Sequence, residues 1–123
     1  MALSADIMTA GFSDFKARAI NGQANGAVSA GTTQTQAGAT ALTLSINAVT
    51  TVTTAGDGVR IPNGNIGDSI EIVNLGANAC TVYPPTSGQL NALAVNSGFL
   101  LAVNTAVMLR KFTATRWMGF LSA

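Results

Sequence analysis

The side chains that could carry acid–base or nucleophilic chemistry are few in this chain. It contains no histidine, which excludes Ser–His and Cys–His nucleophilic schemes and removes the commonest zinc ligand. Beyond residue 41 the carboxylates are Asp57, Asp68 and Glu71. Two carboxylates can perform glycosidase-type acid–base work, but Asp57 and Asp68 lie in glycine-flanked turns, where local backbone hydrogen bonds favour aspartate. We therefore expect no catalytic residue and no enzymatic activity.

Two glycine-rich segments, 56–58 and 64–67, have the composition of phosphate-binding loops. Neither opens a helix after a strand, and no lysine follows in the Walker position, so turns between strands explain them. No run of oxygen ligands has the spacing of a calcium loop. Cys80 is the only cysteine, which excludes an intrachain disulfide, and its strand-like surroundings predict a buried thiol. We expect no metal and no cofactor.

Charge is scarce in this sequence. Charged residues make up 9% of the chain, against roughly 25% in typical soluble domains. The net charge of +1 argues against general nucleic-acid binding, which needs a surplus of cations. Because surface charge keeps proteins apart, its scarcity favours a protein that works packed against neighbours. The alternative is a neutral surface of Thr, Ser, Asn and Gln.

The beginning of the chain differs from the remainder. Residues 1–20 lack the basic start and unbroken apolar run of a signal peptide, so we expect no export signal, and no window has the length of a membrane helix. Met8, Phe12 and Phe15 recur at helical spacing, which predicts a short amphipathic helix or arm over residues 4–20. We expect the apolar face of this helix or arm either to cover an open edge of the β domain or to reach another subunit. Residues 21–41, which are small and polar, have the composition of a linker.

Residues 42–123 show the periodicity of short strands. Apolar runs alternate with Asn, Gly and Pro turns at the eight-to-twelve-residue spacing of sandwiches and barrels. We expect residues 79–83 to pair back antiparallel onto residues 70–74. The prediction is an all-β chain: an arm and linker over residues 1–41, then, over residues 42–123, a single antiparallel β-sandwich (jelly-roll-like) or small barrel.

The last strand suggests a contact surface. Alternation places Arg116, Met118 and Phe120 on one face and Trp117 on the other, so both faces look partly covered, as in a strand between its own core and a partner. A core tryptophan is the simpler explanation, and a solvated strand end is the simpler explanation of the adjacent pair Arg110 and Lys111. The candidate interface residues are Ile7, Met8, Phe12, Phe15, Arg110, Lys111, Arg116 and Trp117.

The segment 58–120 resembles a module of small structural proteins of tailed double-stranded-DNA bacteriophages, particularly capsid decoration (cement) proteins and head-fibre components. The resemblance covers about half of the chain, and residues 1–57 lie outside it. The matching elements are residues 58–62, 67–74, 76–79, 82–84, Gly88, Leu90-Asn91 and 105–107, leading to Trp117.

The resemblance implies a structural virion protein, made in the host cytoplasm and located on the capsid surface. Such a protein binds the major capsid protein and stabilises the shell across capsomer junctions. Shell symmetry favours a homo-oligomer, with a trimer preferred to a dimer; we expect neither specific nucleic-acid binding nor membrane binding. The alternative is a head-fibre or tail adhesin segment that binds host surface glycan, and a free small-ligand-binding β domain is a further one.

Overall fold

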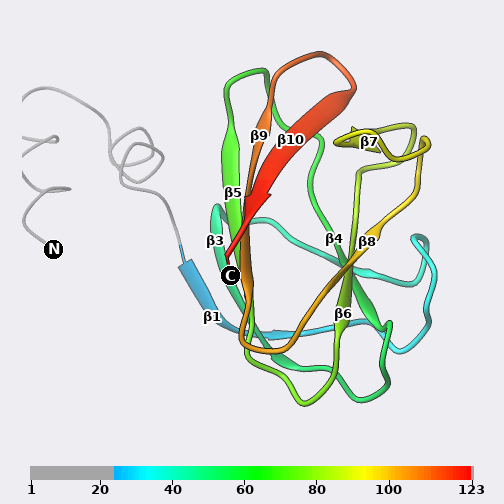
Figure 1. Cartoon of the computed structure of the whole chain (residues 1–123), viewed down its shortest axis with the longest axis vertical. Coiled ribbons are helices and arrows are strands. Elements are labelled where there is room, and N and C mark those ends of the chain that lie inside the picture. Colours follow the sequence, from blue (N-terminus) through cyan, green and yellow to red (C-terminus); the bar gives the residue numbers. More distant parts are fainter. Residues whose placement is uncertain (1–23, 123) are drawn as a thin grey trace, which may run out of the picture.

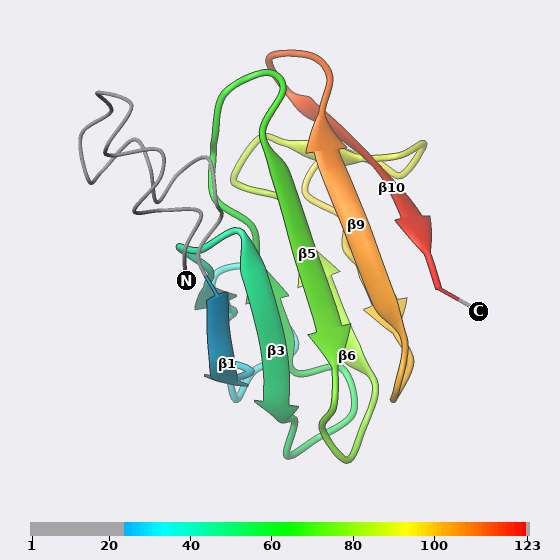
Figure 2. The same ribbon diagram turned by 90° about the vertical axis from the view of Figure 1, so that its left-hand side faces the viewer.

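The computed structural model of the chain describes residues 24–122. Within these residues ten strands form two sheets (Figures 1 and 2). Sheet A has the order β1-β3-β5-β9-β10-β7 and sheet B the order β2-β4-β6-β8. The strands are β1 (Ala24–Ser29), β2 (Thr40–Ala41), β3 (Ile46–Thr51), β4 (Gly58–Arg60), β5 (Ser69–Asn74), β6 (Cys80–Tyr83), β7 (Gln89–Leu90), β8 (Phe99–Leu101), β9 (Ala106–Lys111) and β10 (Arg116–Leu121).

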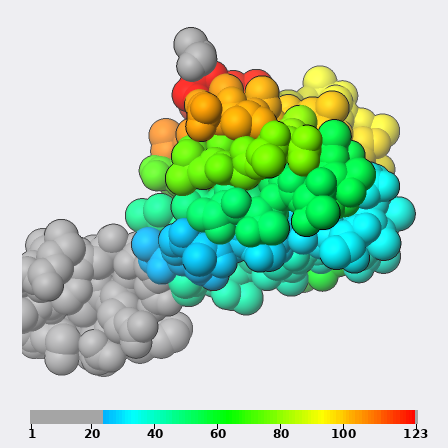
Figure 3. All heavy atoms as spheres, turned by 90° about the horizontal axis from the view of Figure 1, so that it is seen from below, coloured from blue at the N-terminus to red at the C-terminus, as the bar shows by residue number. Residues whose placement is uncertain are grey.

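The chain winds between the two sheets as a solenoid. From β1 to β6 successive strands alternate between sheet A and sheet B, and each strand pairs in parallel with the strand one coil further on. Strands β1, β3 and β5 begin at residues 24, 46 and 69, so one coil takes 22 or 23 residues. Figure 3 shows the coils as stacked bands that follow the chain from blue to green. The fold is a β-solenoid of about four turns with mostly parallel sheets.

The expected antiparallel β-sandwich (jelly-roll-like) or small barrel is therefore wrong, although the all-β class is right. Strands β5 and β6, expected to form a hairpin, lie in opposite sheets. Val82 of β6 instead pairs with Val59 of β4 in parallel and with Phe99 of β8 in antiparallel. Antiparallel pairing within the described residues involves β8, β9 and β10. Strand β7 ends sheet A and pairs in parallel with β10.

The described part of the expected linker contributes two strands. β1 joins sheet A beside β3 and β2 joins sheet B beside β4. Small, polar residues can do this because main-chain hydrogen bonds to an existing edge supply much of the stability; Val28, at 4% exposure, adds an apolar anchor. The helix expected over residues 4–20 lies outside the described residues.

The core fills the space between the sheets. It takes the inward-facing residues of both sheets, because side chains on a strand alternate between faces. Trp117 is its largest fully buried side chain. The core residues are Val28, Leu42, Val49, Val52, Val59, Ile61, Ile70, Ile72, Cys80, Val82, Leu90, Leu101, Val107, Leu109 and Trp117.

Two asparagines, the buried Asn74 and the half-buried Asn78, hold the corners where the chain leaves sheet A. The side-chain amide of Asn74, at the end of β5, donates to the carbonyls of Asn78 and Leu101, both at 2.9 Å, and its Oδ1 accepts from the Gly76 N–H at 2.9 Å. Asn78 in turn donates to the Val52 carbonyl at 2.8 Å. These bonds tie one corner to the corner of the preceding coil, and they help to hold β3 and β5 in register.

Candidate functional site

The outer face of sheet A is the most distinctive surface of the described chain. On β5 the residues Ile70 and Ile72 point into the core, which turns Glu71 outward. On β9 the neighbours of Met108 are more buried and Met108 itself is 44% exposed. On β10 Phe120 is 78% exposed. Large apolar side chains thus stand on the solvent side of adjacent strands.

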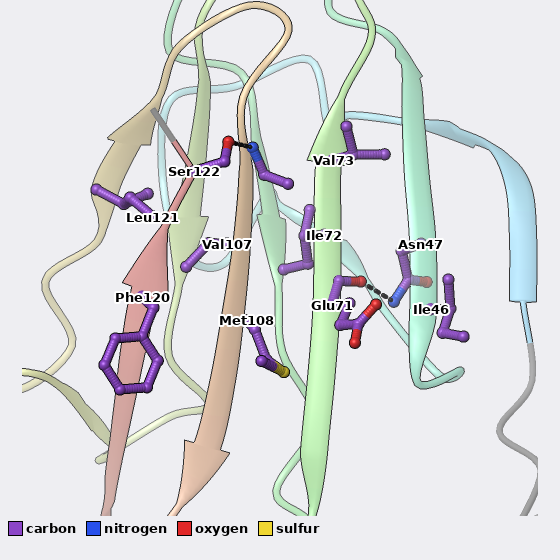
Figure 4. A pocket seen from close by; sticks show the side chains of 11 residues that line it. Ile46, Asn47, Glu71, Ile72, Val73, Val107, Met108, Phe120, Leu121 and Ser122 are labelled. Atoms are coloured by element: carbon purple, nitrogen blue, oxygen red, sulfur yellow. Dashed lines mark hydrogen bonds between the residues drawn. The ribbon is translucent and has the colours of Figure 1, made fainter.

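Strand register brings these side chains into one row. Ile46 of β3 pairs with Glu71, Glu71 pairs with Met108 across β5 and β9, and Met108 pairs with Phe120 across β9 and β10. Figure 4 shows the four side chains running across the sheet in that order. We call this row, together with its outward neighbours Val73, Arg110 and Met118, the outer apolar face. It is a surface of the kind that marks an interaction site on a soluble protein.

A shallow hollow of about 300 Å³ lies in the outer apolar face (Figure 4). Its volume is at the lower end of the roughly 300–1,000 Å³ of small-ligand pockets, and apolar side chains make most of its wall. The lining residues are Ile46, Asn47, Glu71, Ile72, Val73, Ala106, Val107, Met108, Phe120, Leu121 and Ser122. A wide, apolar and open hollow suits the side chains of a partner surface.

Two charged side chains stand on this face without a partner among residues 24–122. Glu71 lies in its row between Ile46 and Met108, while Arg110 pairs with Ser69 and Met118 in the strand register. Glu71 and Arg110 are diagonal neighbours across β5 and β9, a position where Cα atoms lie roughly 7–8 Å apart. Neither side chain makes a hydrogen bond or ion pair with the described residues. The face therefore carries one negative and one positive group inside an apolar surround.

The structure separates the candidate interface residues that the sequence grouped together. Arg110 and Arg116 are exposed on the outer side of sheet A, where Arg116 donates through Nη2 to Gln89 Oε1 at 3.1 Å. Lys111 and Trp117 point inward and are 8% and 1% exposed. The remaining four candidates, Ile7, Met8, Phe12 and Phe15, lie outside the described residues.

Lys111 and Trp117 hold a turn from within. The Lys111 ammonium donates to the carbonyls of Asn63 and Gly64 at 2.7 and 3.0 Å, so Lys111 is not a solvated strand end. A side chain added at Gly64 would meet the Trp117 ring. The Trp117 indole nitrogen has no hydrogen-bond partner within the described chain. Both residues act as supports for the turn over residues 63–65.

The other residues with reactive side chains have structural surroundings. Asp57 is buried and accepts hydrogen bonds from the Thr54 N–H at 3.0 Å and from the Gln34 side-chain amide. Asp68 accepts from the Asn65 N–H at 2.7 Å, which is the turn role expected for both aspartates. Cys80 is fully buried, as predicted, and burial raises the pKa of its thiol to about 11.

Metal-binding clusters and membrane-spanning helices are both absent from the described part of the chain. Residues 24–122 hold no group of three or more Cys, Asp or Glu side chains placed to bind a metal ion. The same residues hold no helix of the length and apolar character that a membrane span requires.

The sequence signal for the outer apolar face was present but incomplete. Alternation correctly placed Arg116, Met118 and Phe120 on one face of β10, and their exposure shows that no other part of residues 24–122 covers this face. Glu71, Met108 and Ile46 were missed, because only the register of the sheet joins them to β10. No family model matches the chain, and no curated protein matches it.

Proposed function

We propose that the chain is a structural virion protein of a tailed bacteriophage, which binds the outside of the capsid and stabilises the shell across capsomer junctions. The observation that carries the proposal is the outer apolar face of sheet A, which marks the chain as a subunit of an assembly, whether a sister subunit or the shell itself covers this face. Burying such a surface against a partner releases roughly 25 cal/mol for each Å² of apolar area. A subunit that presents this face gains free energy by assembling.

Two properties of the chain support an assembly role. The outer apolar face lies largely on strands that pair on both sides, such as β5 and β9. Because such strands are held rigidly, little conformational entropy is lost when a partner binds them. The low charge of the whole sequence, 9% of residues, also limits the electrostatic repulsion between subunits packed closely on a shell. The resemblance of segment 58–120 to decoration proteins is our reason for proposing the shell as the place of assembly.

The proposal is tested with capsids of the phage that encodes the chain. Capsids assembled without the protein are mixed with the purified full-length chain, and bound protein is measured by sedimentation and quantitative gel analysis. We expect saturable binding at a fixed ratio to the major capsid protein, together with greater resistance of the decorated capsids to heat. Binding to host surface polysaccharide without binding to capsids would instead support the adhesin alternative and overturn the proposal.

A further inference from the structure

The outer apolar face poses a specific electrostatic requirement on whatever covers it. Glu71 stands between Ile46 and Met108 in its row, so a partner that buries these apolar side chains also removes water from the carboxylate. Burying a charge without an opposite charge is strongly unfavourable. A covering surface that presents a cation over Glu71 and, one diagonal step away, an anion over Arg110 removes this cost for both charges.

A second copy of the same face meets this requirement. Consider two copies face to face, related by a two-fold axis that lies in the plane between the facing sheets and runs across the midpoint between Glu71 and Arg110. Such an axis places Glu71 of each copy over Arg110 of the other, so both charges gain a partner at once. It also brings Met108, which neighbours both charges, close to the axis. Such isologous contacts are the commonest way in which identical chains pair.

We propose that the outer apolar face is the contact between two copies of this chain, with Glu71 and Arg110 paired reciprocally across a two-fold axis. The contact gives an even-numbered assembly, in place of the trimer expected from the resemblance. This two-fold contact deepens the proposed function, because it assigns the outer apolar face to the sister subunit. It rests on the proposed function only for its location on a capsid, which the pair then binds through another surface.

The test uses charge reversals in the full-length chain. Glu71→Arg places two like-charged pairs across the axis, and so does Arg110→Glu. Each variant alone should dimerise about tenfold or more weakly than the natural chain. In a mixed pair, both facing positions of one variant are positive and both of the other are negative, so every charge regains an opposite partner. An equal mixture should therefore dimerise like the natural chain, measured by light scattering after size exclusion and by sedimentation equilibrium.

The mixing step separates a contact between copies from a contact within one copy, because only complementary partners in different molecules can be restored by mixing. Phe120→Ser, on the face, should also weaken the dimer, whereas Leu100→Ser on β8 of sheet B should not; both side chains are more than half exposed, at 78% and 63%. A natural chain that is monomeric or trimeric, or a mixture that stays as weak as the single variants, would overturn the two-fold contact.

The two proposals fail separately. Capsids that bind the chain while the mixture shows no recovery would retain the virion function and assign the outer apolar face to another partner, such as the major capsid protein or residues 4–20. Recovery of the dimer together with no binding to capsids would retain the two-fold contact and remove the virion function.

Discussion

At the scale of single residues, the solenoid depends on polar side chains buried at its corners. Asn74 is fully buried and uses both ends of its amide. No hydrophobic residue can replace it, because three main-chain groups would lose their partners inside the protein. The sequence shows an asparagine before a turn, but it does not show that the side chain faces inward.

Asn74→Ala should lower the free energy of unfolding by about 3 kcal/mol, since each buried polar group left unsatisfied costs roughly 1–3 kcal/mol. The matched control is Asn25→Ala on β1, where the exposed side chain makes one local bond, to the Ala27 N–H; it should stay within about 0.5 kcal/mol of the natural chain. Urea denaturation followed by circular dichroism measures both. Equal effects of the two substitutions would show that the corner bonds do not stabilise the fold.

Because the Cys80 thiol is buried, the free energy of unfolding should fall as the pH becomes alkaline. Its pKa is about 11 in the folded chain, against 9.0 as the ordinary value, so the unfolded chain loses this proton first. The contribution of Cys80 is therefore complete below pH 9 and is lost as the pH rises toward 11. The loss should reach roughly 3 kcal/mol, because the two pKa values differ by about 2 and each pKa unit corresponds to about 1.4 kcal/mol. Urea denaturation of the natural chain and of Cys80→Ala at several pH values measures it, and parallel pH profiles would contradict it.

The candidate site was partly predictable at this scale. Periodicity of two shows which residues of one strand share a face, and it correctly grouped Arg116 with Phe120. It cannot show which face is turned to the core. Lys111 appeared solvated because lysine is rarely buried, yet its ammonium binds the carbonyls of a turn, over residues 63–65, that lies far earlier in the chain.

At the scale of elements, the positions of the strands could be predicted but their partners could not. The expected strands over residues 70–74 and 79–83 coincide closely with β5 and β6. A turn signal such as Gly76-Ala77-Asn78 is the same whether the chain folds back on the same sheet or crosses to the other one. We expected the first outcome because hairpins are the commoner use of short turns.

The repeat of the solenoid lies in the spacing of its strands and not in the identity of its residues. The strand starts of sheet A at residues 24, 46 and 69 recur with the length of one coil, although no residue pattern repeats with them. Spacing without sequence identity is weak evidence for a repeat architecture. The composition of β1 hid the first coil, because Asn25, Gly26 and Ala27 bury little apolar surface.

The close stacking of coils predicts a specific effect at a corner glycine. A Cβ atom added to Gly76 would lie 2.9 Å from Val52 Cγ2 and 3.0 Å from the Val52 backbone nitrogen, in the corner of the preceding coil. Gly76→Ala should therefore destabilise the fold by roughly 2 kcal/mol, as overpacking of a core typically does.

Gly26→Ala on β1 is the matched control, since no atom lies within 4 Å of the added Cβ. Its effect should stay within about 0.5 kcal/mol. Thermal and urea unfolding of the two variants measure the difference. A tolerated alanine at position 76 would mean that adjacent corners can separate without loss.

At the scale of the whole molecule, the first coil of the solenoid is held less firmly than the interior of the stack. In a solenoid each coil contacts mainly its neighbours, so stability spreads along the stack from coil to coil. β5 lies inside the stack, paired with β3 in parallel and β9 in antiparallel, whereas β1 pairs in sheet A with β3 and its register is irregular. The outer apolar face is built on β5, β9 and β10, with one residue from β3. The proposed contact thus rests on the interior of the stack and not on its first coil.

This difference between the first coil and the interior of the stack predicts a gradient of hydrogen exchange along the chain. Amides of β1 should exchange through local opening, because an edge strand with few buried side chains separates at low free energy. Amides of β5 should exchange only through global unfolding, because breaking their bonds to the Ser45 and Thr105 carbonyls requires β3 or β9 to leave. Exchange measured by mass spectrometry on peptides from the two strands of the full chain tests this order. The Arg110→Glu variant, measured at a concentration where it is monomeric, serves as the reference, and in it β1 should still exchange first. Equal protection of β1 and β5 in that variant would mean that the stack opens as one unit, and that the solenoid has no preferred end from which it unfolds.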